Sequence, residues 1–155
     1  MAKKQKPRGL SEGRMQKLWR QAVITVWRAD PLSGERQEER LQCHHLVFRR
    51  YFLTRHDWRN GVPLSPESHL TVHGVLGNSP ILELLTEEHR EYLTTLQGWT
   101  KKDYLMATGM SEEEFLRMRK HELEYVIDHK INRRDSGWYV LPEVIQGNGS
   151  SITAT

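Results

Sequence analysis

The sequence predicts an α+β fold, in which a short two-stranded sheet and one helix lie between an N-terminal helix and a mainly helical C-terminal part. Three observations carry this prediction. Apolar residues recur at three- and four-residue steps over residues 11–28 and 80–134, a period that is typical of helices. Two short segments, 41–48 and 62–64, have β-compatible residues. A helix-start signal, Ser65-Pro66, follows the second of them directly.

A chain of 155 residues suits one domain with a modest hydrophobic core. We expect that domain to span residues 11–146, with a central motif at about 41–77 and a helical extension at about 80–134. Residues 1–10 are polar and basic and predict a flexible arm, whereas the small polar residues of 147–155 predict a disordered tail.

The first predicted helix runs from about Ser11 to Arg28. Ser11 is a plausible N-cap, because its hydroxyl can accept a hydrogen bond from a free backbone N–H of the first turn. Residues 30–34 then read as a turn. The apolar face of the helix would consist of Met15, Leu18, Trp19, Ala22, Val23, Val26 and Trp27.

The central motif begins with the short apolar strand 41–48. Asn60-Gly61 is a turn signal, and 62–64 follows as the second short strand. Pro63 places this strand at a sheet edge, because proline cannot donate to a strand ladder. Ser65 is then the expected N-cap of a helix that carries His69 and His73 and ends at Gly74 or Gly77.

The C-terminal part predicts several helices. Ser111, followed three residues later by Glu114, forms a capping box that starts a helix reaching to about Asn132. Residues 138–141 predict a short strand. We expect any protein partner to bind through the helical region 80–134.

Composition excludes several classes of protein. The 37% hydrophobic and 28% charged residues are ordinary for a soluble domain, and no apolar run approaches a membrane span, so we expect no membrane association. The basic N-terminus leads into no apolar segment of the kind that a secretory signal contains. Cys43 is the single cysteine, which excludes an intramolecular disulfide and suits a reducing, cytoplasmic location.

The net charge of +3 is unevenly distributed. Residues 1–28 hold eight Lys or Arg against Glu12 alone, and a second basic cluster lies in the middle of the chain. Such clusters predict a polyanionic partner, which we take to be double-stranded DNA. For the N-terminal arm, a merely solubilising role is an equal alternative. The predicted nucleic-acid contacts in the central cluster are Arg49, Arg50, Arg55 and Arg59.

Four histidines in the central motif predict metal chemistry. His69 and His73 lie four residues apart, so on a helix both imidazoles can reach one ion. A third ligand can come from His44 or His45 on the first strand, and three protein ligands leave open positions for water and substrate. Imidazole suits zinc, nickel, copper or manganese better than magnesium. The histidine left over can accept a proton from water.

Asn60 lies between these histidines and cannot titrate, so its role should be geometric. We expect it to hydrogen-bond across the loop and hold the base imidazole in one orientation. Each piece has a simpler interpretation, since a His-x3-His pair on a helix is often surface decoration and His-His pairs arise by chance. Their combination within 30 residues favours a site.

The string His44-His45, Asn60, His69, His73 resembles the HNH, or ββα-metal, nucleases, and its spacing is similar to the variant in the nuclease domains of DNase colicins. A wider set, including Trp19 to Val23 and residues 60–64, resembles small phage and prophage HNH proteins. The clear resemblance covers 41–74, and a looser one covers 15–74. Residues 75–155 show none.

This resemblance implies that His45 is the general base, that His44, His69 and His73 hold the metal, and that Asn60 orients. It also implies a two-stranded ribbon and helix that press into the DNA minor groove. Because neighbours on a regular strand face opposite ways, His44 and His45 can share one site only if the strand twists or bulges.

The chain departs from the resemblance at one point. Many HNH proteins bind a structural zinc through two Cys-x2-Cys pairs, whose places here read Ser65 and Ser68 and the cysteine-free stretch Ala29 to Gly34. We therefore expect no structural zinc, and one catalytic divalent ion, Mg, Mn, Zn or Ni.

The function expected from the sequence is a metal-dependent DNA endonuclease of low sequence specificity, from a phage, prophage or bacterium. Two alternatives stay open: a bacteriocin-type toxin nuclease, and a non-catalytic DNA-binding accessory protein with a structural metal.

Overall fold

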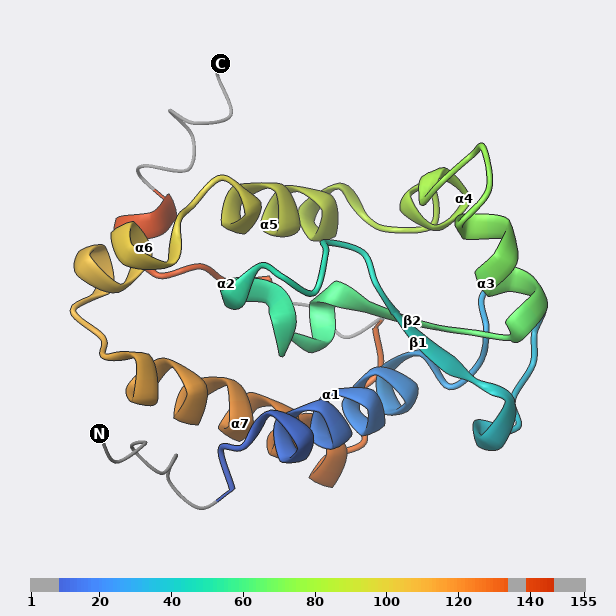
Figure 1. The fold of residues 1–155 in the computed structure, drawn as a ribbon, viewed down its shortest axis with the longest axis horizontal. Coiled ribbons are helices and arrows are strands. Elements are labelled where there is room, and N and C mark those ends of the chain that lie inside the picture. The colour runs from blue at the N-terminus through green and yellow to red at the C-terminus, as the bar shows by residue number, and fades with distance from the viewer. Residues whose placement is uncertain (1–8, 134–138, 147–155) are drawn as a thin grey trace, which may run out of the picture.

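The computed structural model describes residues 9–133 and 139–146, and it has an α+β fold (Figure 1). The expected tail at 147–155 and most of the expected arm lie outside the described residues. Leu10 is a correction to the arm, because its side chain is buried in the core. The elements are α1 (Glu12–Trp27), η1 (Glu38–Arg40), β1 (Gln42–His45), α2 (Phe52–Arg55), η2 (Trp58–Asn60), β2 (Gly61–Leu64), α3 (Pro66–Val72), α4 (Ser79–Leu82), α5 (Glu87–Gln97), α6 (Lys101–Thr108) and α7 (Glu112–Asp128).

Helix α1 matches its prediction closely. The Ser11 hydroxyl accepts a hydrogen bond from the Arg14 backbone N–H, which confirms the predicted N-cap. Its apolar face is buried, and two tryptophans add polar contacts: the Trp19 indole donates to the Asp57 carbonyl and the Trp27 indole to the Gly61 carbonyl. The helix therefore fixes the loop and the second strand by hydrogen bonds as well as by packing.

The sheet is an antiparallel pair, with Gln42 opposite Leu64 and His45 opposite Gly61. Helix α1 packs against both strands, whereas α5 contacts α2 and η2 from the opposite side (Figure 1). Gly61 is required here, because a Cβ at this position would lie 2.7 Å from Cζ2 of Trp19. Since each strand has one partner, Pro63 is at a sheet edge as predicted.

Helix α3 begins at a hydrogen-bonded cluster that also holds the turn after α1. Ser65 is the N-cap, as predicted, and its hydroxyl accepts from the Ser68 N–H. The buried Asp30 carboxylate accepts hydrogen bonds from the Ser65 N–H at 2.8 Å and the Ser33 hydroxyl at 2.7 Å. The helix ends at Val72, which makes His73 its C-cap rather than an interior residue.

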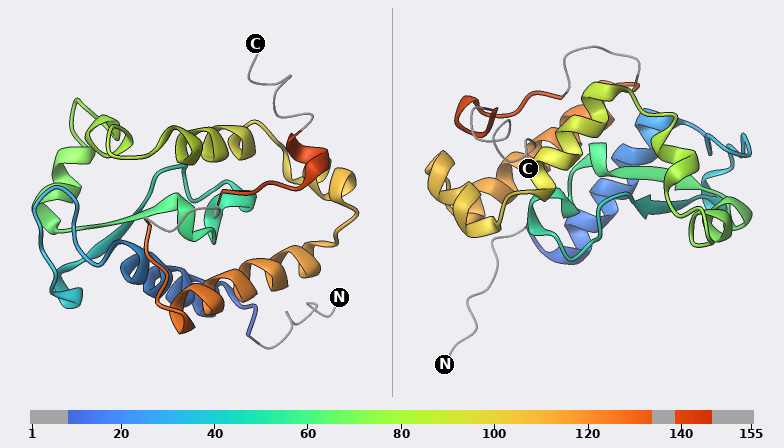
Figure 2. Two further views of the ribbon diagram at one scale, coloured as in Figure 1. Left: turned by 180° about the vertical axis from the view of Figure 1, so that it is seen from behind. Right: turned by 90° about the horizontal axis from the view of Figure 1, so that it is seen from above.

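The C-terminal helices cover the central elements from two sides. Helix α7 packs along α1, and α5 lies across the opposite side (Figure 2). Ser111 caps α7 as predicted, since its hydroxyl accepts from the Glu114 N–H. The helix ends at Asp128, short of the expected Asn132, and Lys130 has a left-handed backbone with φ 50°. The expected strand at 138–141 was wrong for its described residues, 139–141.

A buried charged network joins the loop before β2 to the C-terminal helices. Arg59 lies 2.8 Å from both Asp57 and Glu122, and Arg119 lies 3.1 Å from Asp57. The Tyr92 hydroxyl donates to Asp57. Burial alone would raise the pKa of Asp57, but Arg119 and Arg59 hold it at about 2. The paired charges therefore replace solvation inside the core.

In the described ranges, none of the helices combines the length and the apolar character needed to cross a bilayer.

Candidate metal centre

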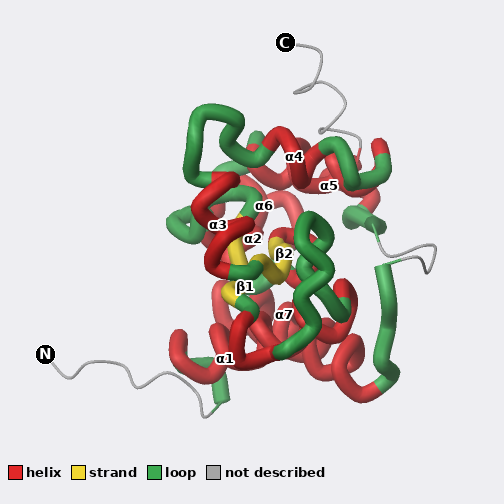
Figure 3. Tube along the Cα trace, turned by 90° about the vertical axis from the view of Figure 1, so that its right-hand side faces the viewer, coloured by secondary structure: helices red, strands yellow, loops and turns green. Residues whose placement is uncertain are grey.

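Three histidines meet at one end of the molecule, where β1 and α3 lie side by side (Figure 3). They are His44 from β1, His69 from α3 and His73 from its C-cap. His44 Nδ1 lies 3.3 Å from His69 Nε2, which lies 2.9 Å from His73 Nε2. All three ligand nitrogens lie within 4.8 Å of one another. Nitrogens bound to one tetrahedral ion at about 2.0–2.1 Å are about 3.3 Å apart, so the two short spacings are close to those around a shared ion.

The regular pleat of β1 explains which histidine joins this group. Gln42 and His44 face α3, where the Gln42 side-chain oxygen lies 2.6 Å from His69 Nδ1. Cys43 and His45 face α1, because the Cys43 thiol contacts the Arg20 carbonyl and the His45 ring stacks on Trp19. The register through His45 is regular, so the bulge that would place His44 and His45 together is absent from this strand.

The surroundings favour neutral, metal-binding imidazoles. Burial lowers the pKa of His44, against the opposing effect of a hydrogen bond to Asn78. Burial and the neighbouring His44 and His73 lower the pKa of His69. Three imidazole nitrogens, with His73 exposed to solvent, are a donor set suited to a transition-metal ion.

His45 lies apart from the three-histidine cluster. Its ring is parallel to that of Trp19, with 3.9 Å between the centroids and 5° between the planes. His45 Nε2 lies 3.0 Å from the Arg55 carbonyl, which can only accept, so Nε2 carries the proton and Nδ1 is the basic nitrogen. Burial, together with the charge of Arg49, lowers the pKa of His45 to about 4, although the Arg55 carbonyl opposes this shift.

Asn60 is fully buried, and all its side-chain hydrogen bonds in the described residues go to the backbone of the preceding loop. Its carbonyl oxygen accepts from the Val47 N–H at 2.6 Å. Its amide donates to the carbonyls of Val47 and Thr54. Asn60 thus crosses the loop as expected, but it holds the loop backbone and makes no direct hydrogen bond to the His45 imidazole.

The four central arginines occupy different environments. Arg49 and Arg50 are exposed, and Arg55 is half-buried and donates to the carbonyls of Arg49 and Arg50. Arg59 is a correction: only 5% of it is exposed, and its guanidinium is held by Asp57 and Glu122. Arg59 is therefore not available for the predicted DNA contact.

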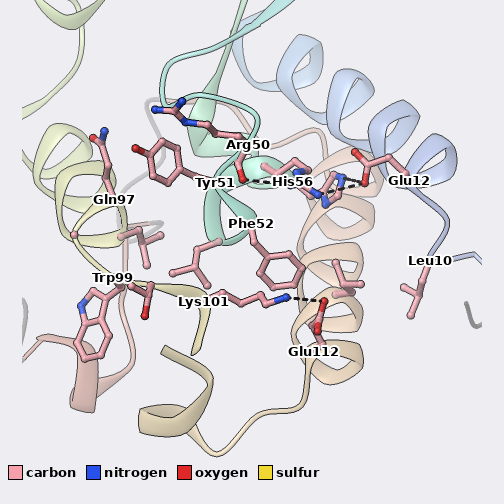
Figure 4. Close-up of a pocket in the computed structure, with 16 residues that line it drawn as sticks. Leu10, Glu12, Arg50, Tyr51, Phe52, His56, Gln97, Trp99, Lys101 and Glu112 are labelled. Carbon is pink, nitrogen blue, oxygen red and sulfur yellow. Dashed lines mark hydrogen bonds and ion pairs between the residues drawn. The ribbon is translucent and has the colours of Figure 1, made fainter. Parts of the chain in front are cut away.

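Glu12 is an acidic counterpart to these arginines that sequence reasoning missed. Its carboxylate lies 3.3 Å from Arg49, 3.8 Å from Arg55 and 3.4 Å from His56. Glu12 and His56 lie on the wall of a cavity of about 590 Å³, as Figure 4 shows. The positive charge beside the loop is therefore partly neutralised, whereas Arg50 forms no ion pair within the described residues.

Other residues were also missed or misplaced by sequence reasoning. Asn78 contacts His44, but it lies beyond the recognised motif, where no spacing signal points to it. His89 is buried, and its Nε2 meets the Arg59 carbonyl, a position that no motif in the sequence indicates. Trp58 is in the core.

Comparison of the chain with protein-family models, with curated proteins and with solved structures gives no match.

Proposed function

We propose that the protein is a metal-dependent DNA endonuclease, in which β1, β2 and α3 form a ββα-metal core of the HNH type. The observation that carries the proposal is the convergence of three imidazole nitrogens, from His44, His69 and His73, while a fourth imidazole, His45, stays outside the cluster on the other face of β1. A closed structural site would use four protein ligands, whereas three leave a position open.

The bound ion would polarise a phosphate oxygen and stabilise the departing oxygen. The chain supplies the proton acceptor. Water attacks phosphorus and gives its proton to His45 Nδ1, while the bond from phosphorus to the departing sugar oxygen breaks. The Arg55 carbonyl and the Trp19 ring hold the His45 imidazole in place, and Asn60 holds the loop from which that carbonyl comes.

The DNA backbone is expected to pass over the exposed arginines that follow β1. The Arg49 side chain is 56% exposed, and Arg50 is exposed as well, with its guanidinium over the Phe48 ring. Arginine matches phosphate with a forked pair of donors and stays charged at any relevant pH. These contacts carry no base information, which agrees with low sequence specificity.

Cleavage of supercoiled plasmid tests the proposal. We expect the protein to cleave with Mg²⁺, Mn²⁺, Zn²⁺ or Ni²⁺ and to be inactive in a chelator. His45→Ala should lower the rate by about 10²–10⁴-fold, because a general base is lost, with unchanged metal affinity in calorimetry. The matched control is His121→Ala on the exposed face of α7.

Two results would count against this function. Metal binding without cleavage by any ion would instead favour the DNA-binding accessory protein. A His45→Ala variant that loses metal would make His45 a ligand.

A further inference from the structure

Asn78 connects the histidine cluster to the loop before α4. Its side-chain carbonyl oxygen lies 2.8 Å from His44 Nε2, and its amide nitrogen donates to the Leu46 carbonyl at 3.1 Å. We propose that Asn78 is a positioning residue that fixes the tautomer of His44, so that Nδ1 faces His69 and His73 as a metal ligand. This inference rests on the proposed metal centre.

Hydrogen-bond chemistry determines the direction of each contact. The Leu46 carbonyl can only accept, so the NH₂ group of Asn78 must point at it. The carbonyl oxygen of the same amide therefore points at His44, and it can only accept too. Nε2 of His44 must then carry the proton, which leaves the lone pair on Nδ1.

His69 has a similar, more exposed partner. Gln42 Oε1 lies 2.6 Å from His69 Nδ1, so a proton on that nitrogen leaves the Nε2 lone pair free. The two lone pairs, on His44 Nδ1 and His69 Nε2, then face each other across 3.3 Å. Two neutral acceptors repel at this distance, and a cation between them removes the repulsion. The partners outside the cluster thus prepare it for an ion.

The Asn78 side chain takes no part in capping the helix that follows it, the four-residue α4. Within the described chain, both of its polar groups are directed to β1 and the residue that follows it, His44 and Leu46. The Asn78 side chain therefore positions the strand that carries the proposed metal ligand His44.

The test uses the full chain and two substitutions that separate acceptor from donor. Asn78→Ala removes the acceptor for His44, and we expect about 10–100-fold weaker binding of Zn²⁺ in calorimetry. Asn78→Asp keeps an oxygen acceptor, and we expect affinity within a few-fold of the parent. Nitrogen NMR of the metal-free parent should show His44 protonated at Nε2, and Asn78→Ala should show both tautomers.

The outcomes separate this inference from the proposed function. If the parent protein binds no Zn²⁺, the proposed metal centre fails. If the parent binds Zn²⁺ but Asn78→Ala binds it equally well, only the role of Asn78 is overturned. A metal-free parent with His44 protonated at Nδ1 also overturns it, whether or not the alanine variant folds. Weak binding by both variants would contradict the acceptor role, since Asn78→Asp retains it.

Discussion

Two polar clusters lie at opposite ends of α3, and they differ in whether their hydrogen-bond acceptors all face donors. At the start of the helix, Asp30, Ser33, Ser65 and Ser68 form a closed hydrogen-bonded set. The carboxylate accepts from the Ser33 hydroxyl and from the backbone N–H groups of Leu32, Ser33 and Ser65, and the Ser65 hydroxyl donates to Ser68. At its end, three imidazole nitrogens converge, and the lone pairs of His44 Nδ1 and His69 Nε2 face each other across 3.3 Å. The first cluster is complete in itself, whereas the second is suited to an added cation.

Spacing alone does not identify a set of metal ligands. In the first cluster, two residues separate Asp30 from Ser33, and two residues separate Ser65 from Ser68. These are the regions where the HNH resemblance would place two Cys-x2-Cys pairs. Thiolates at such positions repel one another unless a metal binds them. A carboxylate with hydroxyl groups satisfies itself by hydrogen bonds. Residue type therefore decides whether the same junction needs an ion.

The largest expected effect comes from converting the first cluster into a metal site. We expect the variant with cysteine at positions 30, 33, 65 and 68 to bind a second Zn²⁺ per chain, whereas the parent binds at most one. Structural zinc contributes about 10–16 kcal/mol of apparent binding energy in small domains, so folding of the variant should depend on zinc. Elemental analysis and chelator titration measure both effects. Two Zn²⁺ ions per chain in the parent would mean that a second metal site exists without the added cysteines.

Removing one member from each cluster should give different signatures. His73→Ala should abolish the metal-induced rise in melting temperature, which corresponds to about 2.7 kcal/mol at a metal concentration of 100 Kd. Ser68→Ala should cost about 0.5–1.5 kcal/mol for a lost hydrogen bond, with the metal-induced rise intact. Thermal unfolding with and without Zn²⁺ separates the two. An unchanged rise in His73→Ala would remove His73 from the site.

The smallest effect concerns the acid range. Burial alone would raise the pKa of Asp30, but hydrogen bonds from Ser68, Ser65 and Ser33 hold it below its usual value. Because the folded state lowers this pKa, the carboxylate stabilises the fold above about pH 4, and this contribution falls as the pH drops further. Asp30→Asn should cost about 1–3 kcal/mol at pH 7.

Urea unfolding between pH 3 and 7 measures that difference. The gap between parent and Asp30→Asn should narrow as the pH falls. A gap that stays constant with pH would mean that the Asp30 carboxylate is not the stabilising form.

Local signals in the sequence predicted a large part of the fold. The caps at Ser11, Ser65 and Ser111 depend on a side chain and a backbone N–H three residues away, so they can be read from neighbouring residues. The proximity of His69 and His73 follows from helical spacing in the same way. The regular pleat then decides that His44, rather than His45, joins them.

The remaining features depend on contacts between distant parts of the chain. Arg59 was expected to contact DNA because it belongs to the central basic cluster, but its partner Glu122 lies 63 residues away. Asn78 lies 34 residues from His44, in a segment with no motif. A single sequence does not encode such pairs in any local pattern, because they arise when helices α5 and α7 and the loop before α4 pack on the strands.

The buried network of Asp57, Arg59, Arg119 and Glu122 has a consequence for how the protein can open. Arg119 also donates to the Leu53 carbonyl, so one side chain of α7 binds both α2 and the residues just before β2. Releasing that loop would leave buried charges without partners, which is far more costly than separating apolar surfaces. Helix α7 and the loop next to Asn60 must therefore unfold together. A fragment limited to residues 41–77 would lack Arg119 and Glu122, whose charges keep that loop closed.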